Sequence, residues 1–213
     1  DVVDLTKVAA TGRPYWLAGG YGTADQFVAA REQGAAGVQV GTVFALSAES
    51  GLRPELRESM LRSLADGTLD VRTDGRASPT GFPFKVVQQD GTVADPVVVG
   101  QRERICDLGY LRTPFEREDG SVGYRCPSEP VDAFVKKGGD VDETEGRLCL
   151  CNGLLATAGH AQRRPASGGL TEEPPLLTLG QDLDGARDLQ ARYPDGWSAA
   201  DVVAWLTADL ART

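Results

Sequence analysis

The chain has 213 residues, 41% of them hydrophobic and 7% aromatic, which is enough for one domain with a real core, or for a domain with an appendage. Its net charge of −9 argues against nucleic acids and anionic membranes as partners. There is no apolar run approaching the ~20 residues that span a bilayer, and no secretory signal is visible, so we expect a cytoplasmic protein.

Residues 13–49 predict a strand, a helix and a second strand in succession. The two strands are short apolar runs at 15–18 and 37–40, and each is stopped by small residues. Between them, Thr23 and Gln26 have the spacing of a capping box, which marks a helix start. Such a strand–helix–strand unit is expected to have parallel strands and a right-handed crossover.

The small residues follow the strands at the end where parallel α/β folds bind ligands. Gly19, Gly20 and Gly41 allow backbone N–H groups to approach an anion closely. Thr42 adds a hydroxyl and begins a short predicted helix whose N-terminus points to the same place. The alternative is that these glycines only make tight turns. Two such turns, one βα unit apart, favour a phosphate site with these candidate cofactor-binding residues: Ala18, Gly19, Gly20, Gln39, Gly41 and Thr42.

The rest of the chain predicts shorter and less regular elements. In chain order they are a helix over 51–65, an irregular segment over 71–87, a strand at 97–99, a hairpin over 115–125, a helix over 130–137, a helix or coil over 152–162 with Leu154 and Leu155 in the core, a polar loop over 163–175, and helices over 184–193 and after Ser198. Apolar residues of the last helix include Val202, Trp205 and Leu210.

All four cysteines lie in one stretch that is rich in turns: Cys106, Cys126, Cys149 and Cys151. Without a secretory signal, disulfides are disfavoured. Four thiols in such a segment match a tetrahedral zinc site, which would stabilise a subdomain with little core of its own. The Cys-x-Cys spacing of the last two is less usual than Cys-x-x-Cys, and the alternative is four free buried thiols.

The phrases LAGG and GAAGVQVGTVFALSAES, separated by the first helix, resemble the nitronate monooxygenase (2-nitropropane dioxygenase-like) family of FMN-dependent TIM barrels. In that family the matching glycines and the Gly-Thr pair hold the FMN phosphate after the last two barrel strands. Barrels of the IMP dehydrogenase type share a similar second turn. Four later phrases are similar to the long bacterial members of the family: ASPTGFPFK, CDLGYLRTPF, YRCPSEPVD and CLCNGLLA.

The resemblance implies an α/β fold class. Residues 1–87 would be the C-terminal portion of a TIM (β/α)8-type barrel, and residues 88–213 an irregular, Cys-containing α+β extension. A whole barrel takes about 250 residues, and the phosphate-binding strands lie within the first fifty here. We therefore expect a further polypeptide to supply the N-terminal part of the barrel.

The implied activity is the flavin-dependent oxidation of alkyl nitronates by O2 to a carbonyl compound and nitrite, with FMN as the cofactor and a small-molecule substrate. Two alternatives are a flavin-dependent enoyl reductase of polyketide or fatty-acid synthesis on the same scaffold, and a non-catalytic partner subunit or fragment. The catalytic histidine of the family lies upstream of the matched segment. His160, the single histidine, falls in no matching motif, so no residue of this chain is assigned a catalytic role.

Overall fold

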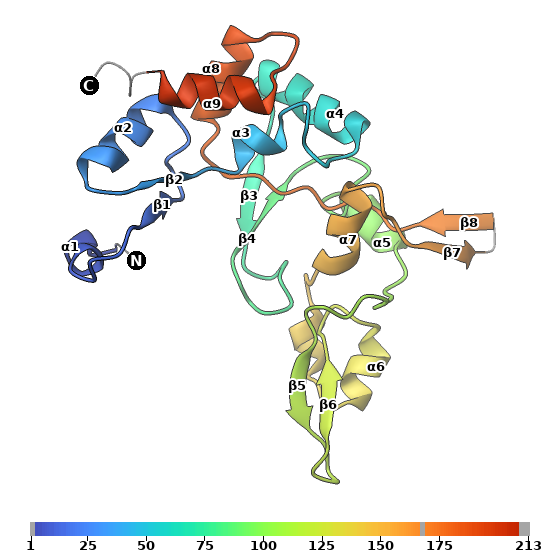
Figure 1. Cartoon of the computed structure of the whole chain (residues 1–213). Coiled ribbons are helices and arrows are strands. Elements are labelled where there is room, and N and C mark those ends of the chain that lie inside the picture. Colours follow the sequence, from blue (N-terminus) through green and yellow to red (C-terminus); the bar gives the residue numbers. More distant parts are fainter. Residues whose placement is uncertain (1–2, 167–168, 209–213) are drawn as a thin grey trace. The chain divides into compact units, whose positions relative to one another are not determined.

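The computed structural model describes residues 3–166 and 169–208 of the chain (Figure 1). The chain divides into two compact units. The first comprises Asp1–Leu69 and Leu179–Thr213, and the second comprises Asp70–Thr178. Short helices and two-stranded sheets make up both units, so the described residues have a mixed α/β structure without a closed barrel.

The first unit contains a βαβ segment and further helices. Its elements are α1 (Leu5–Ala9), β1 (Trp16–Ala18), α2 (Ala24–Glu32), β2 (Gly37–Gln39), α3 (Thr42–Ala45), α4 (Pro54–Ala65), α8 (Asp184–Arg192) and α9 (Ala199–Thr207). The strands β1 and β2 run parallel, with Leu17 paired to Val38. This confirms the strand–helix–strand order predicted from the sequence.

Local signals explain where these helices begin. The hydroxyl of Thr23 accepts the N–H of Gln26, whose side chain accepts the Thr23 N–H at 2.9 Å, so the predicted capping box starts α2. Ser198 and Asp201 form the same arrangement at the start of α9. Pro54 occupies the first turn of α4, where its missing N–H costs no hydrogen bond.

The core of the first unit joins its two sequence segments. The apolar stripe of α4 is buried at Leu56, Met60 and Leu64. Helix α8 packs against α3 and α4, and α9 packs against α2 and α3. Trp197, just before α9, is 3% exposed and donates from Nε1 to the carbonyl oxygen of Val43 at 2.7 Å. Residues 179–208 therefore share a core with the βαβ segment, although the sequence places them in a separate extension. Leu210 lies outside the described residues.

The second unit is built from antiparallel hairpins joined by short helices. Its elements are β3 (Val71–Asp74), β4 (Phe84–Val87), α5 (Pro96–Gln101), β5 (Thr113–Glu116), β6 (Val122–Arg125), α6 (Val131–Lys136), the 3-10 helix η1 (Val141–Thr144), α7 (Leu150–Thr157), β7 (Arg163–Ala166) and β8 (Gly169–Glu172). The predicted hairpin over 115–125 and the predicted helix over 130–137 are confirmed as β5–β6 and α6. A buried cluster of Val93, Leu150 and Leu176 forms part of the core.

Two segments predicted to be irregular form hairpins. The sequence predicts no regular structure over 71–87, but β3 and β4 pair antiparallel there, because the prolines and glycines are confined to the linking residues 75–83. The division between the units accordingly falls at residue 69 and not at residue 87. The polar loop predicted over 163–175 contains β7 and β8, across which Arg163 pairs with Glu172 at 2.7 Å.

The strand predicted at residues 97–99 is wrong, since these residues belong to α5. The Asp95 side chain caps the helix by accepting the N–H of Val97 at 2.9 Å. Pro96 follows at the first helical position, where proline is favoured. These two start signals outweigh the strand preference of the Val-Val-Val run.

The sequence predicts Leu154 and Leu155 in the core, but α7 buries Leu150, Asn152, Gly153, Ala156 and Thr157 instead, and Leu155 is half-buried. Leu154 is 37% exposed. Gly153 faces inward, where an added Cβ would lie 2.7 Å from the Cβ of Leu176. The N–H of Leu176 donates to the carbonyl oxygen of Gly153 at 3.0 Å. Close approach of two backbones therefore determines which face of α7 is buried.

The second unit also buries ionic groups. Both carboxylate oxygens of Glu173, whose side chain is 1% exposed, are engaged: Oε1 by Arg102 at 2.7 Å and Oε2 by Arg164 at 3.0 Å. Glu129 is 2% exposed and accepts from Nζ of Lys137 at 2.8 Å. Removing one partner of such a buried pair leaves an uncompensated charge.

The helices of the described residues are all too short or too polar to cross a membrane. The longest of them, α4, has 12 residues. At 1.5 Å per residue it extends about 18 Å, well below the ~30 Å of a bilayer core.

Candidate functional site

The two strand ends predicted to form a phosphate cradle lie next to each other. The last residues of β1 and β2, Ala18 and Gln39, are register partners in the parallel pair. The turns that follow, Gly19–Gly20 and Gly41–Thr42, therefore leave the sheet at the same edge. We call these six residues the cradle. The structure thus brings all the predicted cofactor-binding residues together.

The glycines of the cradle are conformationally special and open to solvent. Gly19 and Gly20 have φ angles of 80° and 84°, which strain any residue with a Cβ. At Gly19, Gly20 and Gly41 an added Cβ would meet no heavy atom within 4 Å. Within the described part of the chain, the N–H groups of these three glycines donate to no acceptor. They are therefore available to a ligand.

Thr42 is held by a distant part of the chain. Its Oγ1 accepts the N–H of Gly180 at 2.8 Å. A hydroxyl has one proton to donate in addition to its acceptor sites, so Thr42 can still donate to an anion. Gly41 is the N-cap of α3, and no side chain caps this helix. Because α3 has only four residues, its helix dipole is small. Its contribution to the cradle is therefore its free backbone N–H groups.

The same C-terminal segment contacts the first glycine turn. A Cβ added to Gly185, at the start of α8, would lie 1.9 Å from the carbonyl oxygen of Gly22. A Cβ added to Gly180 would lie 2.9 Å from Oγ1 of Thr42. Sequence reasoning missed both glycines, which are far from the cradle in the chain. The available signal was a pair of glycines that flank residues 181–184 at the start of a predicted helix.

The chemistry of the cradle is that of anion binding. It presents backbone N–H donors and one hydroxyl, and its six residues include no ionisable side chain. Clustered N–H groups at a turn or a helix start bind phosphate oxygens in many folds. The cradle can therefore hold and orient an anionic group, but it has no nucleophile or general base.

The four predicted metal ligands lie in the second unit, and all are free thiols. Cys126 and Cys149 are buried, whereas Cys106 and Cys151 are half-buried. Among residues 3–166 and 169–208, no three Cys, His, Asp or Glu side chains are placed as a ready-made metal site. The metal site therefore stays a prediction at this point.

Burial controls the ionisation of two of these thiols. It raises the pKa of Cys126, which hydrogen bonds from Ser128 lower and the neighbouring Cys106 raises. Burial raises the pKa of Cys149 further, to about 11. In the metal-free chain both groups are therefore neutral thiols near pH 7.

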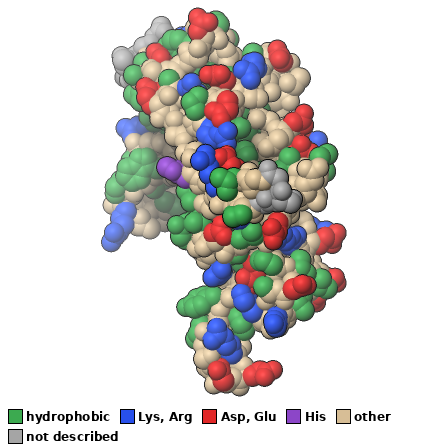
Figure 2. Space-filling model, turned by 90° about the vertical axis from the view of Figure 1, so that its right-hand side faces the viewer, with side chains coloured by type: hydrophobic (Ala, Val, Ile, Leu, Met, Phe, Trp, Pro, Cys, Tyr) green, Lys and Arg blue, Asp and Glu red, His purple; other side chains and the backbone are tan. Residues whose placement is uncertain are grey.

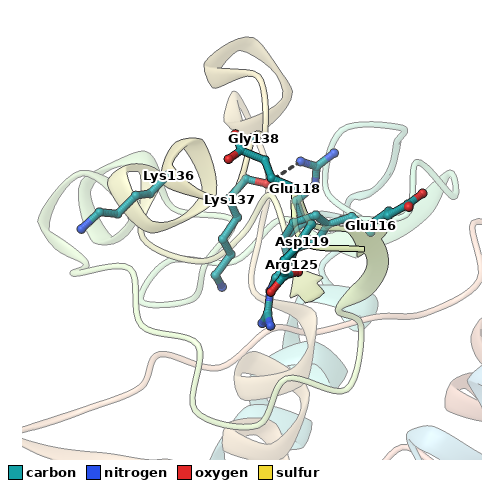
Figure 3. Close-up of a pocket in the computed structure, with 9 residues that line it drawn as sticks. Glu116, Glu118, Asp119, Arg125, Lys136, Lys137 and Gly138 are labelled. Carbon is teal, nitrogen blue, oxygen red and sulfur yellow. Dashed lines mark hydrogen bonds between the residues drawn. The ribbon is translucent and has the colours of Figure 1, made fainter. Parts of the chain in front are cut away.

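A polar hollow of about 650 Å³ lies between the β5–β6 hairpin and α6 (Figure 3). The hairpin lines it with acidic side chains and with Arg117 and Arg125, and Lys136 and Lys137 add further positive charge, so both signs are present. Arg125 lies over the rings of Phe115 and Phe134, at 4.9 and 5.6 Å, and donates to the carbonyl oxygen of Lys137 at 2.8 Å. Lys137 is also paired to Glu129. Arg125 and Lys137 are therefore both engaged in contacts within the chain.

A second hollow, of about 490 Å³, is apolar and lies beside α7. Its lining includes Phe82 and Tyr110, which are 64% and 72% exposed. The hydroxyl groups of Ser78 and Thr80, which also line it, hydrogen-bond to each other at 2.8 Å. Most of the other lining residues are apolar, so this hollow offers mainly apolar contact.

His160 is exposed just after α7 and is visible as the purple side chain in Figure 2. Its backbone N–H donates to the carbonyl oxygen of Leu155 at 2.8 Å and helps end the helix. This position gives the histidine no catalytic role.

Comparison with known proteins found no matching family model, curated protein or solved structure. The family resemblance thus rests on the motif residues alone. The geometry of the cradle is an observation separate from that resemblance.

Proposed function

We propose that the cradle binds the phosphate of FMN, and that the chain is the cofactor-binding part of an oxidoreductase that converts alkyl nitronates to a carbonyl compound and nitrite. The observation that carries the proposal is the pairing of Ala18 with Gln39. It brings two glycine turns, each predicted separately to approach an anion, to one edge of a parallel strand pair.

A phosphate group fits the donors that are present. Its oxygens accept hydrogen bonds from backbone N–H groups and from a hydroxyl, and such charge-assisted bonds are about twice as strong as neutral ones. A Cβ built on Gly19, Gly20 or Gly41 would meet no heavy atom within 4 Å, so the backbone at these positions is open to a ligand. Motif residues shared with the nitronate monooxygenases favour FMN over other phosphate esters.

Flavin, when bound, supplies the redox chemistry, and this chain supplies binding and orientation. The N–H of Gly180 donates to Oγ1 of Thr42 at 2.8 Å and so orients the hydroxyl. Because Oγ1 is the acceptor in this bond, the hydroxyl proton of Thr42 can be donated to the phosphate. Gly185 lets α8 approach the backbone of Gly22, two residues after the first glycine turn.

The strand pair itself supports a need for further strands. Within the described residues, β1 and β2 pair only with each other. Trp16 on β1 is 60% exposed, although parallel sheets are normally covered on both faces. We therefore include in the proposal a second polypeptide whose strands extend this pair into a barrel and which contributes the catalytic histidine.

The phosphate site can be tested on the chain itself by NMR with uniform 15N labelling. Addition of FMN should shift the amide signals of Gly19, Gly20, Gly41 and Thr42, whereas riboflavin, which lacks the phosphate, should leave them in place. Inorganic phosphate should shift the same signals more weakly. Unchanged cradle amides at millimolar FMN would refute the proposed site.

A matched pair of variants separates binding from backbone strain. Gly20→Val and Gly67→Val each place a Cβ at a positive φ, 84° and 69°, and each Cβ meets open space. Both should lose similar stability, but only Gly20→Val should abolish the FMN-dependent amide shifts. Equal FMN responses in the two variants would remove the basis of the proposal.

Thr42 provides a graded test. Thr42→Val removes the hydroxyl and should weaken FMN by about 1–3 kcal/mol, the usual size of a hydrogen bond to a charged group. Thr42→Ser keeps the hydroxyl and should restore most of the affinity. Two activity assays of the assembled enzyme then identify the reaction. Release of nitrite from alkyl nitronates would support the proposed oxidation, whereas NAD(P)H-dependent reduction of an alkene would support the enoyl reductase alternative.

A further inference from the structure

The four cysteines are brought into one neighbourhood by hydrogen bonds between three separate segments of the second unit. The segments are residues 104–106, 126–128 and 148–152, which carry Cys106, Cys126 and the Cys149–Cys151 pair. Three direct bonds join them. Each cysteine lies within one residue of a group that makes one of these bonds.

The first bond joins Nη1 of Arg104 to the carbonyl oxygen of Pro127, at 3.2 Å, next to Cys126. In the second, Nδ2 of Asn152 donates to the carbonyl oxygen of Ile105 at 3.3 Å, which connects the neighbours of Cys151 and Cys106.

The third bond runs from Oγ of Ser128 to the carbonyl oxygen of Leu148, at 2.8 Å, next to Cys149. Ser128 is 3% exposed and its bond is partly buried, so it is a fixed element of the fold. Each of the three segments is therefore bonded to both of the others.

This part of the unit has little apolar core. Between residues 104 and 152, the buried hydrophobic side chains of the described chain are Cys126, Phe134, Cys149 and Leu150. Pro127 is buried as well, and the buried polar side chains there include Glu129, Thr144 and Asn152. Segments that bury so little apolar surface commonly need a covalent or metal cross-link to stay folded.

We propose that the three segments bind a single Zn²⁺ ion through their four thiolates, those of Cys106, Cys126, Cys149 and Cys151. Four thiols are the donor set of a closed, structural zinc site. Cys149 is the N-cap of α7 and Cys151 lies in its first turn, where the helix favours negative charge. In the metal-free chain the sulfurs are not yet gathered round one point. The three side-chain-to-backbone hydrogen bonds hold the cysteine-bearing segments next to one another.

The proposal is independent of the flavin site, which lies in the first unit. Its test uses the full chain, purified without added metal and without chelator. Elemental analysis should find about one zinc per chain. Zinc at less than a tenth of that content, in a chain that also takes up no Zn²⁺ when the ion is added in excess, would overturn it.

Cobalt(II) substitution reads the donor set without any mutation. The chain reconstituted with Co²⁺ should show the intense visible bands of tetrahedral cobalt and the near-ultraviolet sulfur-to-metal charge-transfer band of four thiolates. Co²⁺ binding without the charge-transfer band would refute the thiolate set. A disulfide between any two of the four cysteines in the freshly isolated chain would also refute it.

Variants then assign the ligands. Each single Cys→Ser change, for example Cys106→Ser or Cys151→Ser, should reduce the zinc content at least tenfold after dialysis against a competing chelator. The matched control is His160→Ala, which removes the single imidazole and should leave the zinc content unchanged. Full zinc content in any Cys→Ser variant, or loss of zinc in His160→Ala, would disprove the four-cysteine assignment.

Discussion

Trp197→Phe is the substitution that tests most directly how the C-terminal helices support the cradle. Trp197 is 3% exposed, and its Nε1 donates to the carbonyl oxygen of Val43, the residue after Thr42, at 2.7 Å. Phenylalanine fills most of the same space but has no donor. The change therefore removes one tie between residues 179–208 and α3.

The expected cost follows from two effects. Val43 is 2% exposed, so its carbonyl oxygen is left without a partner and away from water, which costs about 1–3 kcal/mol. The smaller ring also leaves a cavity, which adds about 1 kcal/mol. A total of about 2–4 kcal/mol is a large part of the 5–15 kcal/mol that stabilises a typical domain.

Urea unfolding followed by tryptophan fluorescence measures this loss in the first unit alone. The three tryptophans of the chain are at positions 16, 197 and 205, all within that unit. With a slope of about 1–3 kcal/mol per molar urea, the midpoint should fall by at least ~0.7 M. The control is Trp16→Phe, at a 60% exposed position, which should change stability by less than about 0.5 kcal/mol. Equal midpoints for Trp197→Phe and the wild type would refute the reasoning.

Other perturbations test the packing of each unit. Glu173→Gln leaves two partly buried arginines without their shared carboxylate and should destabilise the second unit by about 3–5 kcal/mol. The control Glu172→Gln, at an exposed ion pair, should cost less than about 1 kcal/mol. Thermal melts followed by circular dichroism measure both losses. Gly185→Ala drives a methyl group into the carbonyl oxygen of Gly22 and should cost about 1–3 kcal/mol; an unchanged fluorescence midpoint would contradict that contact. Because burial raises the pKa of Cys149 to about 11, this thiol in the native, metal-free chain should alkylate slowly at pH 8 and faster as the pH rises toward that value, whereas in urea it should react at the ordinary thiol rate. Rapid native alkylation at pH 8, read by peptide mass spectrometry, would show that the site is accessible and unperturbed.

The cradle is an example of a site that local sequence signals could predict. Gly19–Gly20 stop one strand, Gly41–Thr42 stop the next, and the capping box at Thr23 starts the helix between them. Each signal acts within a few residues, because turn conformation and helix capping depend on neighbouring backbone groups. The short connection through one helix then makes the strands parallel, which places both turns at one edge.

The failures of prediction have two different causes. The Val-Val-Val run at 97–99 has strand propensity but is helical, because the adjacent Asp95 and Pro96 start a helix there; this signal is local, and the prediction gave it too little weight. Leu154 looks like a core residue, yet the close approach of Leu176 to Gly153 places a different face of α7 inward. No local pattern contains this second contact, since the two residues are more than twenty positions apart in the chain.

By itself, the sequence determined the order of the βαβ segment, the helix starts and the residues of the cradle, since these depend on local backbone chemistry. Tertiary structure alone decided that residues 179–208 return to the first unit. It also placed Gly180 on the Thr42 hydroxyl and Gly185 against the first turn, and it hydrogen-bonded the three cysteine-bearing segments to one another. These features depend on packing and hydrogen bonds between segments that are far apart along the chain, and such contacts exist only once the core has formed.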